Sequence, residues 1–144
     1  MRIQPCTIAD LGALTEIVED YHGPTEDFHL RIRSDVLGIT FGTWFLYDGM
    51  AMCYERIGKR KAQAHIYSVS RDKRGKRLRD FAVKAGRWML DNTEVTTILN
   101  FVEPDRRDLM FFMRMIGSKK VGVIPGTNQI LYVSTGDMGI REDI

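Results

Sequence analysis

The chain has 144 residues, of which 44% are hydrophobic and 28% are charged, and its formal net charge is +2. This composition is that of a globular domain and excludes a polyelectrolyte. No apolar run approaches the roughly 20 residues of a membrane helix, no signal peptide is visible, and Cys6 and Cys53 form neither a metal-binding nor a redox spacing. We therefore expect a cytoplasmic protein with one domain over residues 1–135 and a polar, detachable tail over residues 136–144.

The N-terminal part predicts one strand and two helices. Residues 1–6 alternate in polarity and indicate a short strand. Thr7 and Asp10 then form a capping-box pattern ahead of an apolar stripe with helical spacing, which Gly23 ends. A second helix is expected after Thr25, because apolar residues recur there at intervals of four.

The middle of the chain predicts an antiparallel meander of three strands. Residues 39–47 are β-branched and aromatic, Asp48-Gly49 is a two-residue hairpin signal, and residues 50–57 return. A basic turn leads into the third strand at residues 62–69.

The last part predicts helix, strand, helix and hairpin. A long amphipathic helix ends near Asn92, and residues 96–102 are apolar enough for a central strand covered on both faces. A helix follows over residues 105–116, with Pro104 in its first turn and Gly117 after its end. Strands at residues 121–124 and 129–134 complete the order β-α-α-β-β-β-α-β-α-β-β, an α/β (α+β) fold with a mixed sheet. The strands at 62–69 and 96–102 should be parallel neighbours, since a helix joins them.

A basic loop at the junction of the third meander strand and the long helix is the strongest candidate site. Nine positions contain six basic residues, namely Arg71, Lys73, Arg74, Lys76, Arg77 and Arg79. The free amides at a helix start favour an anion, so a ligand that carries phosphate is expected. A solvated charged face is the alternative. Nucleic acid is not expected, because β-geometry places the other basic turn roughly 25 Å away along the strand.

The element order and the Arg74-Gly75-Lys76 loop resemble the GNAT superfamily of acyl-coenzyme A-dependent N-acyltransferases. The resemblance spans Arg2 to about Ser134. Residues 3–17 (IQPCTIADLGALTEI) are similar to the first strand and helix of the family. Residues 69–79 resemble its pyrophosphate-binding signature, Val…Arg-Gly-x-Gly-x-Gly/Ala, and residues 104–118 resemble its last helix. The resemblance implies a GNAT-like mixed sheet flanked by helices.

The same resemblance implies acetyl-coenzyme A as the cofactor and an amine of a small molecule or a protein as the acceptor. In the family, loop amides hold the pyrophosphate and the strand end pairs with the pantetheine arm. The matching positions here are Val69, Arg71, Arg74, Gly75, Lys76, Arg77 and Leu78.

Four positions depart from the family pattern. Arg77 and Arg79 replace small residues of the loop, Arg106 stands where asparagine is usual, and Met113 stands where a tyrosine protonates the leaving thiolate. The sequence therefore predicts an N-acyltransferase with a degenerate site, and leaves enzymatic activity open. The alternative is an inactive GNAT-fold binding or assembly protein in a phage virion or head.

A phage origin is suggested by residues 82–99 (AVKAGRWMLDNTEVTTIL), which are similar to GNAT-like proteins of tailed phages. The location would then be the host cytoplasm or the virion. The apolar residues of the last helix exceed one stripe, which leaves a homo-oligomer or a phage assembly partner open.

Acyl transfer needs a base for the ammonium and an acid for the thiolate. Glu103, His65 and Glu55 are the candidate bases, and Tyr132 and Tyr67 are the candidate acids. Glu103 follows a central strand, where open α/β sheets bind ligands. A solvated carboxylate at Glu103, surface positions for His65 and Glu55, and packing roles for both tyrosines are the alternatives.

Overall fold

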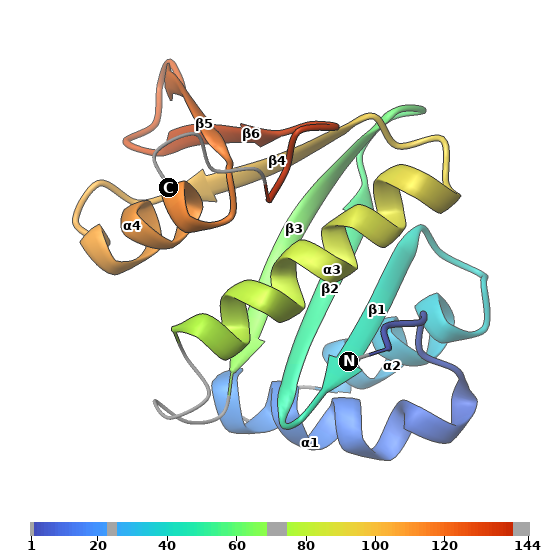
Figure 1. Ribbon diagram of the computed structural model, residues 1–144. Coiled ribbons are helices and arrows are strands. Elements are labelled where there is room, and N and C mark those ends of the chain that lie inside the picture. Colours follow the sequence, from blue (N-terminus) through green and yellow to red (C-terminus); the bar gives the residue numbers. More distant parts are fainter. Residues whose placement is uncertain (1, 23–25, 69–74, 140–144) are drawn as a thin grey trace.

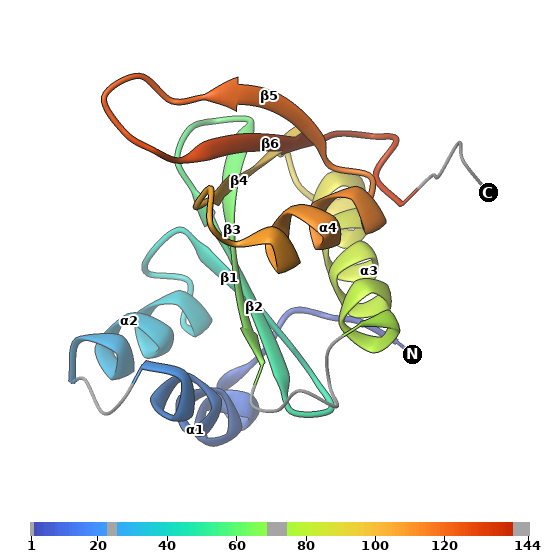
Figure 2. The same ribbon diagram turned by 90° about the vertical axis from the view of Figure 1, so that its left-hand side faces the viewer.

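The computed structural model describes residues 2–22, 26–68 and 75–139. Its elements are a 3₁₀ turn Ile8–Asp10, α1 Leu11–His22, α2 Glu26–Val36, β1 Gly42–Tyr47, β2 Met50–Arg56, β3 Lys61–Ser68, α3 Lys76–Asn92, β4 Thr97–Val102, α4 Arg107–Met115, β5 Lys119–Val123 and β6 Ile130–Ser134. The strands form one sheet in the order β1-β2-β3-β4-β6-β5 (Figure 1). Helices α1 and α2 cover one face and α3 the other (Figure 2). The predicted mixed α/β fold is confirmed.

The predicted first strand is wrong, since residues 2–6 form no strand. One backbone hydrogen bond, from the Cys6 N–H to the Trp44 carbonyl at 2.7 Å, holds this segment against β1. Pro5 has no N–H to give to a ladder, which limits further pairing. The predicted cap is present, because the Asp10 carboxylate accepts the Thr7 backbone N–H at 2.8 Å. The expected helix ends at Gly23 and Thr25 lie outside the described residues.

The start of α4 also differs from the prediction. Pro104 lies in a turn before the helix, closed by a hydrogen bond of 3.0 Å from the Arg106 N–H to the Glu103 carbonyl. The helix itself begins at Arg107. Its other end is as predicted: Gly117 has a φ of 80°, a left-handed conformation that glycine adopts without strain.

The predicted meander of β1, β2 and β3 is confirmed. Its first turn has positive φ at both central residues, 49° at Asp48 and 76° at Gly49. Those values match the mirror-image turn that the twist of a hairpin favours. Alternate side chains of β2 then face opposite layers, so that Met52 packs under α3 while Cys53 packs under α1 and α2.

The parallel pair of β3 and β4 is confirmed, but its ladder is short. Register partners run from Lys61 with Thr97 to Gln63 with Leu99, and no pair follows in the described part of the sheet. Past these positions the two strands diverge (Figure 1). β4 stays paired along its other edge with β6, from Ile98 to Val102. The sheet is therefore split between the far halves of β3 and β4.

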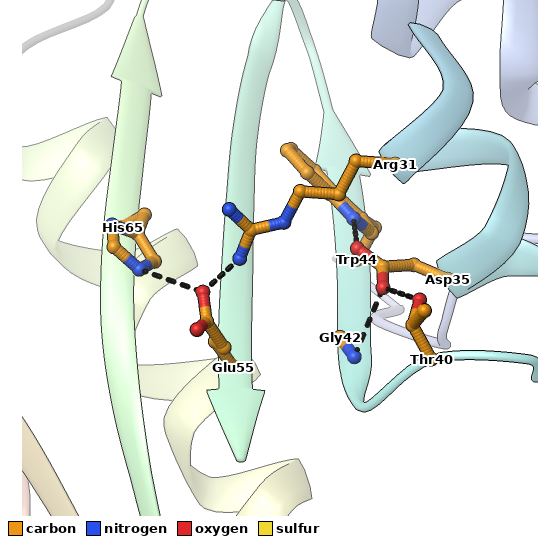
Figure 3. Close-up of polar contacts among 7 residues, drawn as sticks. All are labelled: Arg31, Asp35, Thr40, Gly42, Trp44, Glu55 and His65. Atoms are coloured by element: carbon orange, nitrogen blue, oxygen red, sulfur yellow. Dashed lines mark hydrogen bonds and ion pairs between the residues drawn. The ribbon is translucent and has the colours of Figure 1, made fainter. Parts of the chain in front are cut away.

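A buried carboxylate ties α2 to the sheet on the face away from α3. Asp35 accepts the Trp44 indole N–H at 2.7 Å and the Gly42 amide at 3.1 Å, and also the Thr40 hydroxyl (Figure 3). A Cβ on Gly42 would overlap the Asp35 carboxylate, so the close approach needs glycine. This network fixes the position of α2 against β1.

Replacing Asp35 by alanine should lower the free energy of unfolding by more than about 2 kcal/mol, because the buried Trp44 N–H loses its acceptor. Urea denaturation followed by tryptophan fluorescence measures this change. The matched control is Asp91→Ala, an exposed carboxylate beside Arg87, with an expected change within about 0.5 kcal/mol. Equal effects of the two substitutions would contradict the account.

Residues 136–139 do not behave as the detachable tail expected from the sequence. Met138 is 4% exposed and packs over Gly86 of α3, where a Cβ would lie 2.5 Å from the Met138 sulfur. The Gly139 N–H donates to the Ile116 carbonyl at 2.8 Å. This segment therefore bridges α3 and the end of α4. Residues 140–144 lie outside the described residues, and the domain limit at 135 stays a prediction.

A double-mutant cycle tests this bridge. Met138→Ala should cost about 2–5 kcal/mol of unfolding free energy, the range for a buried methionine. Gly86→Ala should destabilise the wild type, since it displaces Met138, but stabilise the Met138→Ala protein by about 1 kcal/mol through helix propensity. Thermal unfolding of the four proteins gives the coupling. Additive effects would show that Met138 does not occupy the space over Gly86.

Candidate functional site

A cavity of about 390 Å³ lies in the split between β3 and β4. β3 contributes Ala64 and Ile66, and β4 contributes Asn100, Phe101 and Val102. All five positions follow the last parallel pair, so the end of the ladder creates the cavity. Its volume lies within the roughly 300–1,000 Å³ of small-molecule sites.

The wall opposite the strands comes from α4 and is mainly apolar. Leu109, Phe112, Met113 and Met115 line it, and Phe111, which is 64% exposed, lies at its edge. Leu109, Phe112, Met113 and Ile116 share one side because they are spaced three and four apart. An apolar wall of this kind suits the alkyl part of a ligand better than a charged part.

The start of α3 closes the third side, where Gly75 and Leu78 line the cavity. Gly75 caps the helix with a φ of 75°, and its carbonyl accepts the first helical hydrogen bond, from the Arg79 N–H at 2.9 Å. The amides of residues 76–78 precede that bond and therefore have no partner within the helix. Together with the helix dipole they favour an anionic group at this end of the cavity.

Two polar features complete the lining. Arg106 and Asp108 form a two-point ion pair, with distances of 3.1 Å and 3.0 Å, and the hydrogen bond from Arg106 lowers the pKa of the Asp108 carboxyl. Deeper in, the Asn100 amide donates to the Ser118 hydroxyl at 3.3 Å and to the Ser134 hydroxyl at 3.4 Å. Asn100 was not predicted as a site residue, although a side-chain amide in an otherwise apolar strand could have indicated one.

The residues predicted to bind coenzyme A have different positions. Gly75 and Leu78 line the cavity, and Lys76 is exposed beside it at the helix start. The guanidinium of Arg77 pairs with Asp48 in the β1–β2 turn at 3.0 Å. Val69, Arg71 and Arg74 lie outside the described residues. The binding role of the whole set stays a prediction.

The three predicted catalytic residues are not brought together. Tyr132 is 5% exposed and packs in the core under α3 and α4, and Glu103 is exposed beyond the end of β4. Neither is among the residues found to line the cavity. His65 lies on the other face of the sheet, beside Glu55 and Arg31 (Figure 3). Their catalytic roles stay predictions.

The position of the expected thiolate acid is occupied by Met113, which is 2% exposed and lines the cavity. A thioether has no proton to donate. No hydroxyl or thiol side chain occurs among the lining residues in the described part of the chain.

The cysteines are poor nucleophiles in this fold. Burial, with a smaller contribution from Asp10, raises the pKa of Cys6 from 9.0 to about 12. Burial, with the Asp35 carboxylate, raises the pKa of Cys53 still further. Because a thiolate is the reacting species, covalent catalysis through either cysteine is not supported.

A disulfide reagent at pH 8 should therefore label neither thiol of the native protein within the time that labels both thiols in urea. The raised pKa of Cys6 also makes the free energy of unfolding depend on pH. The protonated Cys6 thiol stabilises the folded state fully below the unfolded-state pKa of 9.0, and this stabilisation is lost as the pH rises towards about 12. Rapid stoichiometric labelling before unfolding would contradict the low reactivity expected of Cys6, which is partly buried, and of Cys53, which is buried.

No helix in the described ranges is both long and apolar enough to cross a membrane.

Comparison with solved structures shows that this fold is shared with GNAT-family acetyltransferases. A Bacillus cereus acetyltransferase of the GNAT family matches with a TM-score of 0.71 and 12% identity, covering 93% of this chain and 96% of that chain. The Campylobacter jejuni N-acetyltransferase PseH in complex with acetyl coenzyme A matches with a TM-score of 0.70 and 10% identity, covering 94% and 99%. A spermidine N-acetyltransferase SpeG chimera from Vibrio cholerae and hSSAT matches with a TM-score of 0.70 and 14% identity, covering 92% and 93%.

No protein-family model and no curated protein matches the sequence. At these low identities the solved structures show the fold alone. The predicted GNAT-like fold is therefore confirmed. A phage origin and an inactive, assembly-related role both stay predictions.

Proposed function

We propose that the chain is an N-acyltransferase that binds acetyl-coenzyme A in the cavity between β3 and β4 and acylates an amine. The observation that carries this proposal is the early end of the β3–β4 ladder, which opens the sheet where the family resemblance places the coenzyme. The solved acetyltransferases of the same fold support it, and one of them is in complex with acetyl coenzyme A.

The chemistry of the cavity suits this ligand. Coenzyme A joins a diphosphate to a long amide-containing arm that ends in a thiol. The free amides and the positive dipole end at the start of α3 favour the diphosphate, and exposed Lys76 adds charge there. Ala64, Ile66 and the apolar wall of α4 suit the alkyl segments of the arm.

The diverging strands also offer backbone groups to the arm. Beyond Gln63, the edge of β3 that faces β4 makes no ladder pair in the described part of the sheet. Unpaired strand edges bind extended ligands through their N–H and carbonyl groups. The amides of the arm are ligands of that kind, and an N–H at this edge could also stabilise the oxyanion formed on the thioester carbonyl.

The missing acid at Met113 does not by itself prevent acyl transfer. An alkyl thiol ionises near pH 8.5, so a thiolate is a fair leaving group at neutral pH and can take its proton from the attacking amine or from water. The absence of a donor should slow the reaction rather than abolish it. The departures at Arg106 and Met113 favour, as a second candidate, a binding or assembly protein that has lost turnover.

The acceptor is proposed to be a primary amine. Spermidine is the first compound to test, because a spermidine N-acetyltransferase is among the proteins of the same fold. A free protein N-terminus and amino sugars are further acceptors of the same chemistry.

Calorimetric titration with acetyl-coenzyme A tests the proposed donor site. Wild-type protein should bind, and Ala64→Phe should weaken binding at least about tenfold, since the ring fills the cavity between the strands. The control is Gln63→Phe, which places the same ring on the opposite face of β3 and should keep the wild-type affinity. Melting temperatures of both variants check that they remain folded.

Absence of binding by the wild type at millimolar acetyl-coenzyme A would refute the proposal. Binding without turnover on the amine panel would favour the second candidate, a protein that keeps the site but not the reaction.

A further inference from the structure

A cluster of three ionisable side chains lies on the face of the sheet opposite the coenzyme cavity. Arg31 comes from α2, Glu55 from β2 and His65 from β3 (Figure 3). One oxygen of Glu55, Oε2, pairs with the Arg31 guanidinium and lies 3.6 Å from His65 Nε2. All three are about one-third exposed or more, with side-chain exposures of 41%, 35% and 32%. A ligand can therefore reach the cluster from solvent.

The cluster lies where the sheet splits. The last parallel pair joins Gln63 to Leu99, and the next residue of β3 with its side chain on the same face is His65. Phe101 is the corresponding residue of β4, and it lines the cavity. Its neighbours Asn100 and Val102 are buried on the α3 side, so Phe101 points to the side of His65. Phe101 is therefore a cavity-lining residue on the face that carries His65.

The scaffold holds the cluster in place. Arg31 lies one helical turn before Asp35, the buried carboxylate that ties α2 to β1. Glu55 and His65 lie on adjacent antiparallel strands, with His65 in register with Cys53. In this cluster Arg31 holds Glu55, and Glu55 lies beside the imidazole of His65. Sites of proton transfer often have this arrangement, in which one side chain orients the group that orients the base.

We propose that His65 is the base that takes a proton from the acceptor ammonium, and that Glu55 and Arg31 position it. The amine would enter from the α1–α2 face and meet the thioester through the split. This inference rests on the proposed acyl transfer and names the side on which the acceptor binds.

An N–H bond of the ammonium breaks and its proton passes to the imidazole nitrogen away from Glu55. The amine lone pair then forms the bond to the thioester carbon, and the C–S bond breaks in the resulting adduct. The second amine proton neutralises the thiolate, and the imidazolium returns its proton to water. The products are an N-acetyl amine and coenzyme A.

Other ionisable groups on this face bear on the pH dependence. β3 adds Tyr67, which stacks on Trp44, and β2 adds Cys53. The next residues of β4 on this face, Leu99 and Phe101, are apolar. Helix α1, which packs against β3, carries the carboxylates Glu16, Glu19 and Asp20. Glu55 is a carboxylate that lies beside His65, so its removal should change the pH dependence.

The test measures kcat against pH with acetyl-coenzyme A and four amines: spermidine, glucosamine, ethylamine and a peptide with a free N-terminus. His65→Gln should lower kcat at least about 100-fold, the lower range for a general base, and abolish the acid limb of the profile. Its affinity for acetyl-coenzyme A should not change. His65→Asn provides a second variant should the glutamine protein fail to fold.

Glu55→Gln should reduce kcat less and move the acid limb to lower pH, because the imidazolium loses a neighbouring anion. A residue with a merely structural role would not shift this limb. The matched control is Glu94→Gln, an exposed carboxylate 4.0 Å from Arg56, which should leave the profile unchanged.

Wild-type kcat and an intact acid limb in His65→Gln would overturn the inference while the acyltransferase proposal stands. Binding of acetyl-coenzyme A by wild-type protein with no acylation of any of the four amines would also overturn it, and would leave the donor site intact. If acetyl-coenzyme A does not bind, the proposed function fails, and the inference fails with it.

Discussion

The rest of the structure depends on the early end of one parallel ladder. β3 and β4 pair over three positions, from Lys61 to Gln63 on β3, and then separate. β3 remains bonded to β2 and β4 to β6, so each strand keeps one full ladder while the sheet opens between them. Backbone groups left at such an edge need a partner, and a ligand can supply it. A cavity and unpaired strand edges both follow from that separation.

Two helices keep the split from closing. α3 packs on β1 and β2, where Phe81 lies beside Tyr47 and the Ala82 carbonyl accepts the Tyr54 hydroxyl, and Met113 of α4 is buried in the same core. Met138 joins the two helices from the C-terminal side. The cavity walls therefore belong to one packed core, which includes Leu78, Val102 and Met113. On the opposite face, Asp35 and Arg31 tie α2 to the strands beside His65.

Local sequence patterns predicted most of the fold and less of the site. Hydrophobic periodicity, Asp48-Gly49 and Gly117 located the elements, and a helix between two strands predicted their parallel pairing. The predictions of a strand at residues 1–6 and of a helix start at Pro104 were wrong. Each concerned the end of an element, and the ends of elements are the part that a sequence pattern fixes least well. Spacing could not join Arg31 to Glu55, which are 24 residues apart, or give the length of the β3–β4 ladder. Both depend on sheet twist and packing in three dimensions.

A crystal structure of the protein with coenzyme A tests the central claim most directly. The account predicts that the coenzyme lies in the split, with its arm between Ala64 and Ile66 of β3 and Asn100 and Val102 of β4. Its diphosphate should lie at the amides of residues 76–78, and its sulfur should point towards the face that carries His65. Coenzyme bound elsewhere, or a cavity filled by the side chains of α4 while β3 and β4 stay apart, would contradict the account.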